Sequence, residues 1–183
     1  MPDISYASTM FADEGATYDS TFAGEGFSMG APPELKWEIH DLVPLDQLRK
    51  RLKDGRRVSV LAAVVDYQAS EEGSKLPTTV SLTDHTGQPT KLTLWRDIGR
   101  EVLQYIRKGD ILFVSDVTPK EYQGVVNLGF DEWSSRLGIT WRSLVFDEED
   151  ERYRFHEGWR QHIPQAEAVL TEVDWFRRAF PMA

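Results

Sequence analysis

The order of the hydrophobic patterns between residues 58 and 128 most constrains how this chain can fold. Three segments with strand-like patterns come first, a helical pattern follows, and two strand-like segments come last. In order, these are 58–67 (VSVLAAVVDY), 78–83 (TTVSLT), 91–95 (KLTLW), 98–106 with Ile98, Val102, Leu103 and Ile106 at helical spacing, 111–117 (ILFVSDV) and 125–128 (VVNL). Short apolar or alternating runs indicate strands, and recurrence every three to four residues indicates a helix.

Turn and stop signals separate these segments. Residues 84–87 (DHTG) lie between the second and third strand patterns, and Gln123-Gly124 lies between the last two. Gly109 follows the helical pattern and suits the C′ position at the end of that helix. The segments are therefore predicted to be separate elements of one sheet.

Three strands, a helix and two strands is the order of a five-stranded, partly open Greek-key barrel, the OB-fold, with the helix closing one end. A ferredoxin-like unit would need a helix between the first two strands, where residues 68–77 are polar and contain glycine. The first strand is long enough to curl around a barrel and contribute to two sheets. We therefore predict an all-β barrel with α extensions, the barrel occupying residues 57–142.

The extensions have their own patterns. Residues 1–35 are acidic and show no periodicity, which predicts a disordered tail, although its five aromatic residues also suit a segment that folds on a partner. Residues 36–56 contain Leu45, Leu48 and Leu52, the spacing of a short helix that Asp46 could cap. Residues 143–183 comprise an acidic linker (DEEDE, 147–151) and a C-terminal amphipathic helix.

The apolar face of that helix has two interpretations: docking on its own barrel, or contact with another protein chain. The acid-flanked aromatic residues at its end favour a partner. The predicted partner-binding residues are Val169, Leu170, Val173, Trp175, Phe176 and Phe180. Together with the N-terminal tail, they would place the chain in a hetero-oligomer.

Composition excludes several classes of function. The 183 residues contain no cysteine, and none of the four histidines (His40, His85, His156, His162) stands in a metal-ligand pattern. No phosphate-binding glycine loop or nucleophile motif is present, so we nominate no catalytic residue, no metal site and no cofactor. No leader pattern or membrane-spanning apolar run is found, so we expect no membrane partner.

The net charge of −9 argues against nucleic-acid binding only when it is averaged over the whole chain. Residues 1–45 hold 1 basic and 8 acidic residues, residues 46–142 hold 15 and 13, and residues 143–183 hold 5 and 9. The acidity lies in the flanks. The predicted barrel is slightly basic, which is compatible with a polyanionic ligand.

Aromatic and basic residues fall where this kind of barrel binds its ligand. Trp95 ends the third strand, on the outer face if Leu92 and Leu94 point inward, and Tyr122 lies at the turn before the fifth. Both could stack on nucleobases, although a tryptophan at a strand end also commonly packs against the rim of the core. The candidate phosphate-binding residues are Arg57, Lys75, Lys91, Arg96 and Lys120. The basic run from Arg49 to Arg57 suits a solvated helix face, a phosphate contact or a nuclear import signal.

Residues 81–129 resemble the DNA-binding OB-folds of the replication protein A large subunit and their meiosis-specific and shieldin relatives. The matching positions are Asp84, Gly87, Thr93, Leu94, Trp95, Gly109, Tyr122 and Gly124. The resemblance implies that Trp95 and Tyr122 are base-stacking residues and that a helix after the barrel assembles hetero-oligomers. Val125 departs from the pattern, because the family often has a basic residue there.

The sequence thus predicts a nuclear protein, without enzymatic activity, that binds single-stranded DNA within a genome-maintenance complex acting in replication, repair, recombination or at telomeres. RNA is an alternative ligand. The alternative function is a protein-protein interaction adaptor that keeps the barrel and does not bind nucleic acid.

Overall fold

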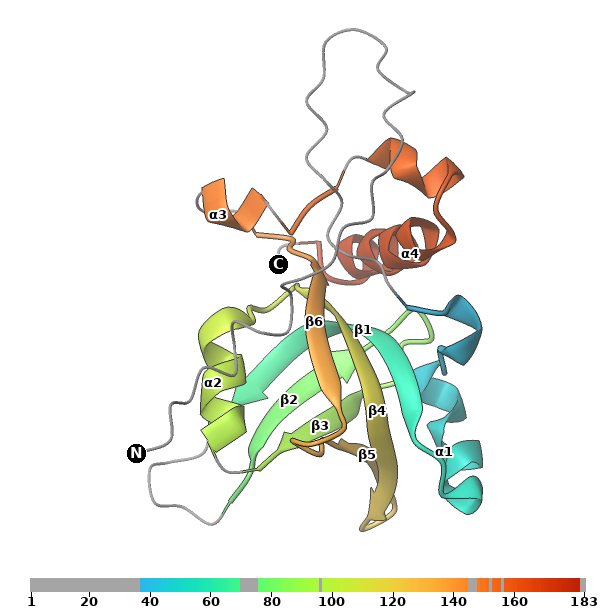
Figure 1. The fold of residues 1–183 in the computed structure, drawn as a ribbon, viewed down its shortest axis with the longest axis vertical. Helices are drawn as coiled ribbons and strands as arrows, with labels where there is room; N and C mark the ends of the chain where they lie inside the picture. Colours follow the sequence, from blue (N-terminus) through green and yellow to red (C-terminus); the bar gives the residue numbers. More distant parts are fainter. Residues whose placement is uncertain are drawn as a thin grey trace, which may run out of the picture.

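The computed structural model describes residues 37–69, 76–95, 97–144, 148–151, 153–155 and 157–181 (Figure 1). The side chains of residues 97, 148 and 149 are not among those described. The predicted tail and two candidate phosphate contacts, Lys75 and Arg96, lie outside these ranges.

Six strands form one curled sheet that closes on itself. They are β1 (Val58–Gln68), β2 (Thr78–Thr83), β3 (Thr90–Leu94), β4 (Ile111–Tyr122), β5 (Val125–Gly129) and β6 (Arg136–Trp141). The order is β1-β2-β3-β5-β4-β6, with β3 and β5 parallel, and β1 also pairs with β4. This closure makes the barrel that the sequence predicts.

The long first strand takes part in two pairings. Its first half, Val58 to Ala63, pairs with β4, and its second half, Ala63 to Gln68, pairs with β2. Its apolar run is continuous because both faces are buried: Val60, Ala62 and Val64 point into the barrel, whereas Leu61 and Ala63 join a second cluster outside it.

Strand β6 is not among the predicted elements, although Leu137, Ile139 and Trp141 alternate with less apolar residues. β5 pairs with residues 118–122 of β4, and β6 with residues 111–115, both on the side opposite β1. They are therefore two parts of one edge, interrupted by residues 130–135. This loop is central to the candidate site.

The N-terminal extension forms short helical turns, η1 (Ile39–Asp41), η2 (Leu45–Gln47), α1 (Leu48–Arg51) and η3 (Leu52–Asp54). The short helix is present, but the predicted cap is wrong: the N-cap position is Pro44, and the Asp46 side chain lies inside the first turn. The backbone N–H of Leu45 instead donates to Asp84 Oδ2 at 2.7 Å, so the β2–β3 turn caps this segment.

Helix α2 (Asp97–Tyr105) packs across one end of the barrel between β3 and β4 (Figure 1). Gly109 does have a positive φ of 86°, but it lies four residues past the helix. Its N–H donates to Val64 O at 2.8 Å, so its role is in the turn that starts β4, not at the predicted helix C′ position.

The C-terminal part contains α3 (Glu148–Glu151), η4 (Glu157–Gln161) and α4 (Pro164–Ala179). Helix α4 lies against β1, β4 and β6 (Figure 1). Its apolar face packs on Leu61, Ile111 and Trp141 in a second hydrophobic cluster outside the barrel. Within the described residues, no helix is long and apolar enough to cross a bilayer.

The helix therefore docks on its own barrel. Val169, Leu170, Val173 and Phe176 are all buried, so the prediction that these four contact a partner is wrong for this structure: the chain's own sheet already covers them. Trp175 is partly buried and packs against the same cluster, and Phe180 lies at its rim, 36% exposed.

Candidate nucleic-acid interface

The outer face of β3, β5 and β4 carries the candidate site in three rows that the register defines. The first row is Val125 and Tyr122; the second is Lys91, Asn127 and Lys120; the third is Thr93, Gly129 and Thr118. Trp95 and Asp131 follow, just past the ends of β3 and β5. The intervening residues, including Leu92, Leu94 and Leu128, point into the core. Alternation therefore places all three rows on one surface.

The two predicted stacking residues both lie on this surface and are exposed. Trp95 is 51% exposed and Tyr122 is 68% exposed. Trp95 follows β3 instead of ending it, and Tyr122 is the last residue of β4, before a turn in which Gln123 and Gly124 both have positive φ. The two rings are six residues apart along the strand direction, or about 20 Å. They are not adjacent and mark the two ends of a strip of the outer surface of the sheet, which we call the groove.

The middle of this surface combines positive charge with little bulk. Lys91 and Lys120 are exposed on either side of Asn127, whose buried Oδ1 atom has no hydrogen-bond partner among the described residues. In the next row Gly129 has no side chain, and the Lys120 side chain runs 3.3–3.5 Å from where a Cβ would stand. The absence of a side chain at Gly129 therefore lets the Lys120 side chain lie across the sheet at this point.

The other predicted phosphate contacts are only partly placed. Arg57 is exposed directly before β1, and its charge acts on Asp131, which puts it near the Trp95 end of the surface. Arg49 lies at the other end, where it donates to Gly124 O at 2.7 Å and pairs with Glu121. In the basic run, Arg49 thus contacts the hairpin, and Arg51 pairs with Asp54 within its own segment.

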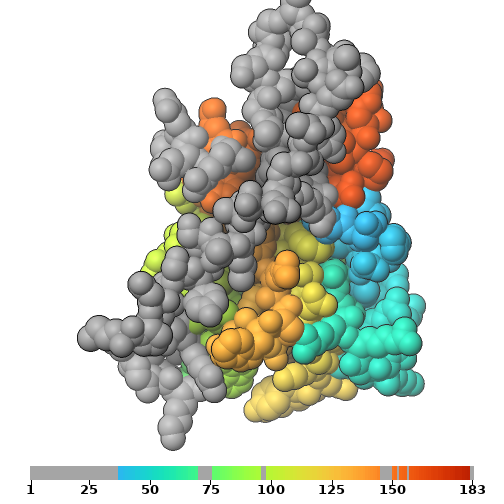
Figure 2. All heavy atoms as spheres, in the orientation of Figure 1, coloured from blue at the N-terminus to red at the C-terminus, as the bar shows by residue number. Residues whose placement is uncertain are grey.

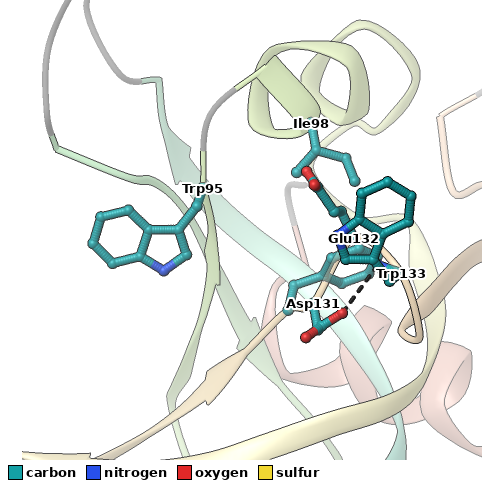
Figure 3. Close-up of a pocket in the computed structure, with 6 residues that line it drawn as sticks. Trp95, Ile98, Asp131, Glu132 and Trp133 are labelled. Carbon is teal, nitrogen blue, oxygen red and sulfur yellow. Dashed lines mark hydrogen bonds between the residues drawn. The ribbon is translucent and has the colours of Figure 1, made fainter.

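A cleft of about 360 Å³ opens at the Trp95 end, lined by Trp95, Ile98, Phe130, Asp131, Glu132 and Trp133. Figure 3 shows the Trp95 ring on one side of the end of β3, and Trp133 with both carboxylates on the other side. Trp133 is 86% exposed. Figure 2 shows the segment around residues 130–140, in orange, at the surface of the molecule's lower half.

Hydrogen bonds hold the loop that carries Trp133. The Trp133 N–H donates to Asp131 Oδ1 at 3.0 Å, and the Ser135 N–H donates to Asp131 O at 2.8 Å. Ser135 Oγ accepts from the Asp131 N–H and donates to Asp116 O at 2.8 Å. The exposed indole is therefore presented by an ordered Asx-type turn anchored to β4.

Asp131 keeps its negative charge at neutral pH. The hydrogen bond from the Trp133 backbone N–H lowers the pKa of this carboxyl, and the charge of Arg57 acts in the same direction. An ionised carboxylate repels phosphate and accepts hydrogen bonds. This end of the groove therefore differs in chemistry from the lysine row.

Trp133 is the site residue that sequence reasoning missed. An indole followed by Ser134-Ser135, ahead of an alternating run, was a visible loop signal, but its closeness to Trp95 depends on how β5 and β6 align on β4. Among the described residues, no three His, Asp or Glu side chains gather as metal ligands would.

Neither a protein-family model nor a curated protein matches this sequence. Solved structures do match. A replication protein A heterotrimer bound to ssDNA aligns with a TM-score of 0.53 and 17% identity over 82% of this chain and 30% of that chain. The structure of fission yeast Pot1 with ssDNA aligns with a TM-score of 0.45 and 16% identity, over 68% of this chain and 41% of that chain. A replication factor A related protein from Methanobacterium thermoautotrophicum aligns with a TM-score of 0.37 and 16% identity, over 46% of this chain and 81% of that chain.

At such low sequence identities, the similarity concerns the fold alone. The alignment with replication protein A, which has a TM-score above 0.5, is the one that supports it. The strand order, the parallel β3–β5 pair and the helix between β3 and β4 are those of an OB-fold. The chain is built on an OB-fold with α extensions, similar to that of replication protein A.

Proposed function

We propose that this chain binds single-stranded DNA through the outer face of β3, β5 and β4. One observation carries the proposal: Trp95 and Tyr122 are exposed on that face, with Lys91 and Lys120 between them. Exposed aromatic rings stack on bases of any sequence, and lysines meet the phosphates between them. The mechanism is non-covalent, and no catalytic step is proposed.

The groove has the length for a short single strand. The roughly 20 Å between the two rings leaves room for several extended nucleotides. The Lys120 side chain lies over Gly129, between Thr93 and Thr118, which puts its ammonium group near the centre of this surface, where it can meet a phosphate. Arg57, Lys75 and Arg96 are proposed as further phosphate contacts. RNA is the alternative ligand.

The cellular context is also a proposal. A replication protein A structure with the same fold is described as a heterotrimer bound to ssDNA. We propose a nuclear subunit of a genome-maintenance complex, with the barrel at residues 57–142 and α-helical extensions on either side. The adaptor alternative is weaker, because α4 buries its apolar face on its own barrel.

Fluorescence anisotropy of a labelled 15-residue oligo-dT, with RNA and duplex as comparators, tests the binding role. Each base stacked on an aromatic ring contributes about 1–3 kcal/mol, so Trp95→Ala and Tyr122→Ala should each weaken binding at least about fivefold. Tyr105→Ala, which removes an equally exposed ring on α2, is the matched control. Unchanged affinity in both groove variants would reject the stacking role.

Salt dependence tests the lysine row separately. Each phosphate contact contributes about −0.7 to the slope of log affinity against log salt for a single strand. Lys91→Ala and Lys120→Ala should each make the slope shallower by about that amount. A slope unchanged in both variants would remove the two lysines from the interface.

A further inference from the structure

Two features at the Trp95 end of the groove are not used by the proposed function. Trp133 exposes most of its indole from a hydrogen-bonded loop, and Asp131 and Glu132 place carboxylates in the same cleft. Neither feature is needed for a phosphate track, and the carboxylates oppose one. The cleft therefore disfavours an anionic group and suits a flat group that donates hydrogen bonds.

A nucleobase meets these requirements. Its faces stack on indole, and the exocyclic amine of cytosine or adenine is a hydrogen-bond donor that suits a carboxylate acceptor. Trp95, just past the end of β3, is one of the residues that line the cleft, so a strand that crosses the lysine row and passes Trp95 can enter it. Arg57 lies close enough to influence Asp131, at a place where it can meet the phosphate of that nucleotide.

We propose that the cleft between Trp95 and residues 130–135 is a second base site, where Trp133 stacks on a nucleobase and Asp131 accepts a hydrogen bond from its exocyclic amine. This inference rests on the proposed function and adds a base preference to it. Cytosine is favoured over uracil or thymine, because O4 of those bases is an acceptor and would face the carboxylate.

The loop geometry supports the role given to Asp131. Its Oδ1 atom accepts the Trp133 N–H at 3.0 Å, which fixes the carboxyl group beside the indole. A carboxylate has about four lone-pair positions, so this bond leaves acceptor capacity for a ligand. Because the side chain is exposed, a base can reach it without any change in the loop.

The test compares labelled oligo-dC and oligo-dU, which lack the thymine methyl group, by anisotropy at pH 7.5. Wild type should bind oligo-dC several-fold more tightly. Asp131→Asn keeps an oxygen for the Trp133 N–H but offers an NH₂ donor to the base, so it should lose or reverse this preference. Trp133→Ala should weaken oligo-dC at least about fivefold, and Trp133→Phe should retain most of the affinity.

The outcomes separate this site from the groove. If wild type binds both oligonucleotides equally, or if Asp131→Asn keeps the wild-type preference, the base-reading role is overturned. If Trp133→Ala stays within twofold of wild type while Trp95→Ala weakens binding, the second site is overturned and the proposed function stands; such a result would point to a protein as the ligand of Trp133. If wild type binds no single strand, both proposals fail together.

Discussion

The absence of a side chain at Gly99 determines how closely helix α2 packs against the barrel. A Cβ atom at this position would stand 2.5 Å from Thr78 Cβ and 2.6 Å from Thr78 Oγ1, and Thr78 is fully buried in β2. Neither group can move aside as a flexible side chain could. The helix therefore lies this close to the sheet only because residue 99 is glycine.

Gly99→Ala should consequently destabilise the protein by about 1–3 kcal/mol, the cost of overpacking a well-filled contact. Urea unfolding followed by circular dichroism measures it. Glu101→Ala, an exposed change in the same helix, is the control and should have little effect. A Gly99→Ala protein as stable as this control would mean that α2 is free to shift.

His85 and Glu172 join the β2–β3 turn to α4. The His85 N–H donates to Glu172 Oε2 at 2.8 Å, and the ring Nδ1 lies 2.5 Å from Oε1. Burial acts to lower the pKa of His85, but the hydrogen bond and charge of Glu172, with Asp84 and Asp46 adding, raise it overall. Burial raises the pKa of Glu172.

Stability should therefore fall as the pH rises. A histidine whose pKa is raised by folding contributes its full stabilisation below its ordinary pKa of about 6.5 and loses it as the pH rises from there through the raised pKa of the folded state. We expect the wild type to lose more thermal stability between pH 6 and pH 8.5 than Glu172→Gln, in which the partner charge is gone. Equal losses in the two proteins would show that this pair does not titrate with unfolding.

At the scale of elements, a buried ion cluster connects β4, β6 and α3. Arg142, directly after β6, bonds Asp110 at 3.0 Å and Asp150 at 2.6 Å, and it donates to Tyr105 O. Asp110 is fully buried; burial raises its pKa, and Arg142 opposes that effect. The guanidinium thus compensates two carboxylates from separate elements.

Arg142→Ala should cost about 3–5 kcal/mol, because buried Asp110 loses its ion-pair partner and Asp150 keeps only its pair with Arg107. Thermal unfolding measures the loss, and Arg136→Ala on the exposed end of β6 is the control. If both variants unfold alike, the cluster contributes only what an exposed pair would.

Strand and helix existence could be predicted from local sequence where the pattern is strong, as for β1, β2 and α2, because alternation and helical spacing reflect one buried face. The helix cap predicted at Asp46 was wrong, because the acceptor that caps this segment comes from a residue far away in the sequence. Asp84, 38 positions beyond Asp46 in the sequence, supplies the acceptor for Leu45, and no local pattern reveals that. The exposure of Trp95 followed from alternation, whereas its neighbour Trp133 depends on the register of two strand halves on β4.

At the scale of the molecule, two apolar clusters lie on opposite faces of the β-sheet. One fills the barrel, and the other lies between the outside of β1, β4 and β6 and the extensions, with Trp37 stacked on Phe113 at 5.0 Å. Each cluster buries one face of β1. The extensions are therefore part of the folded unit and cover a surface that the barrel alone would expose.

Removing residues 164–183 should accordingly destabilise the whole protein. The helix buries four large apolar side chains, at roughly 1.5–3 kcal/mol each, against a net stability of typically about 5–15 kcal/mol. It would also uncover Leu61, Ile111 and Trp141. We expect a lower unfolding temperature and binding of a hydrophobic dye, with Leu170→Ala giving a milder loss of about 2–5 kcal/mol. A truncated chain as stable as the full one would show instead that the helix is held only loosely and is free to bind another protein.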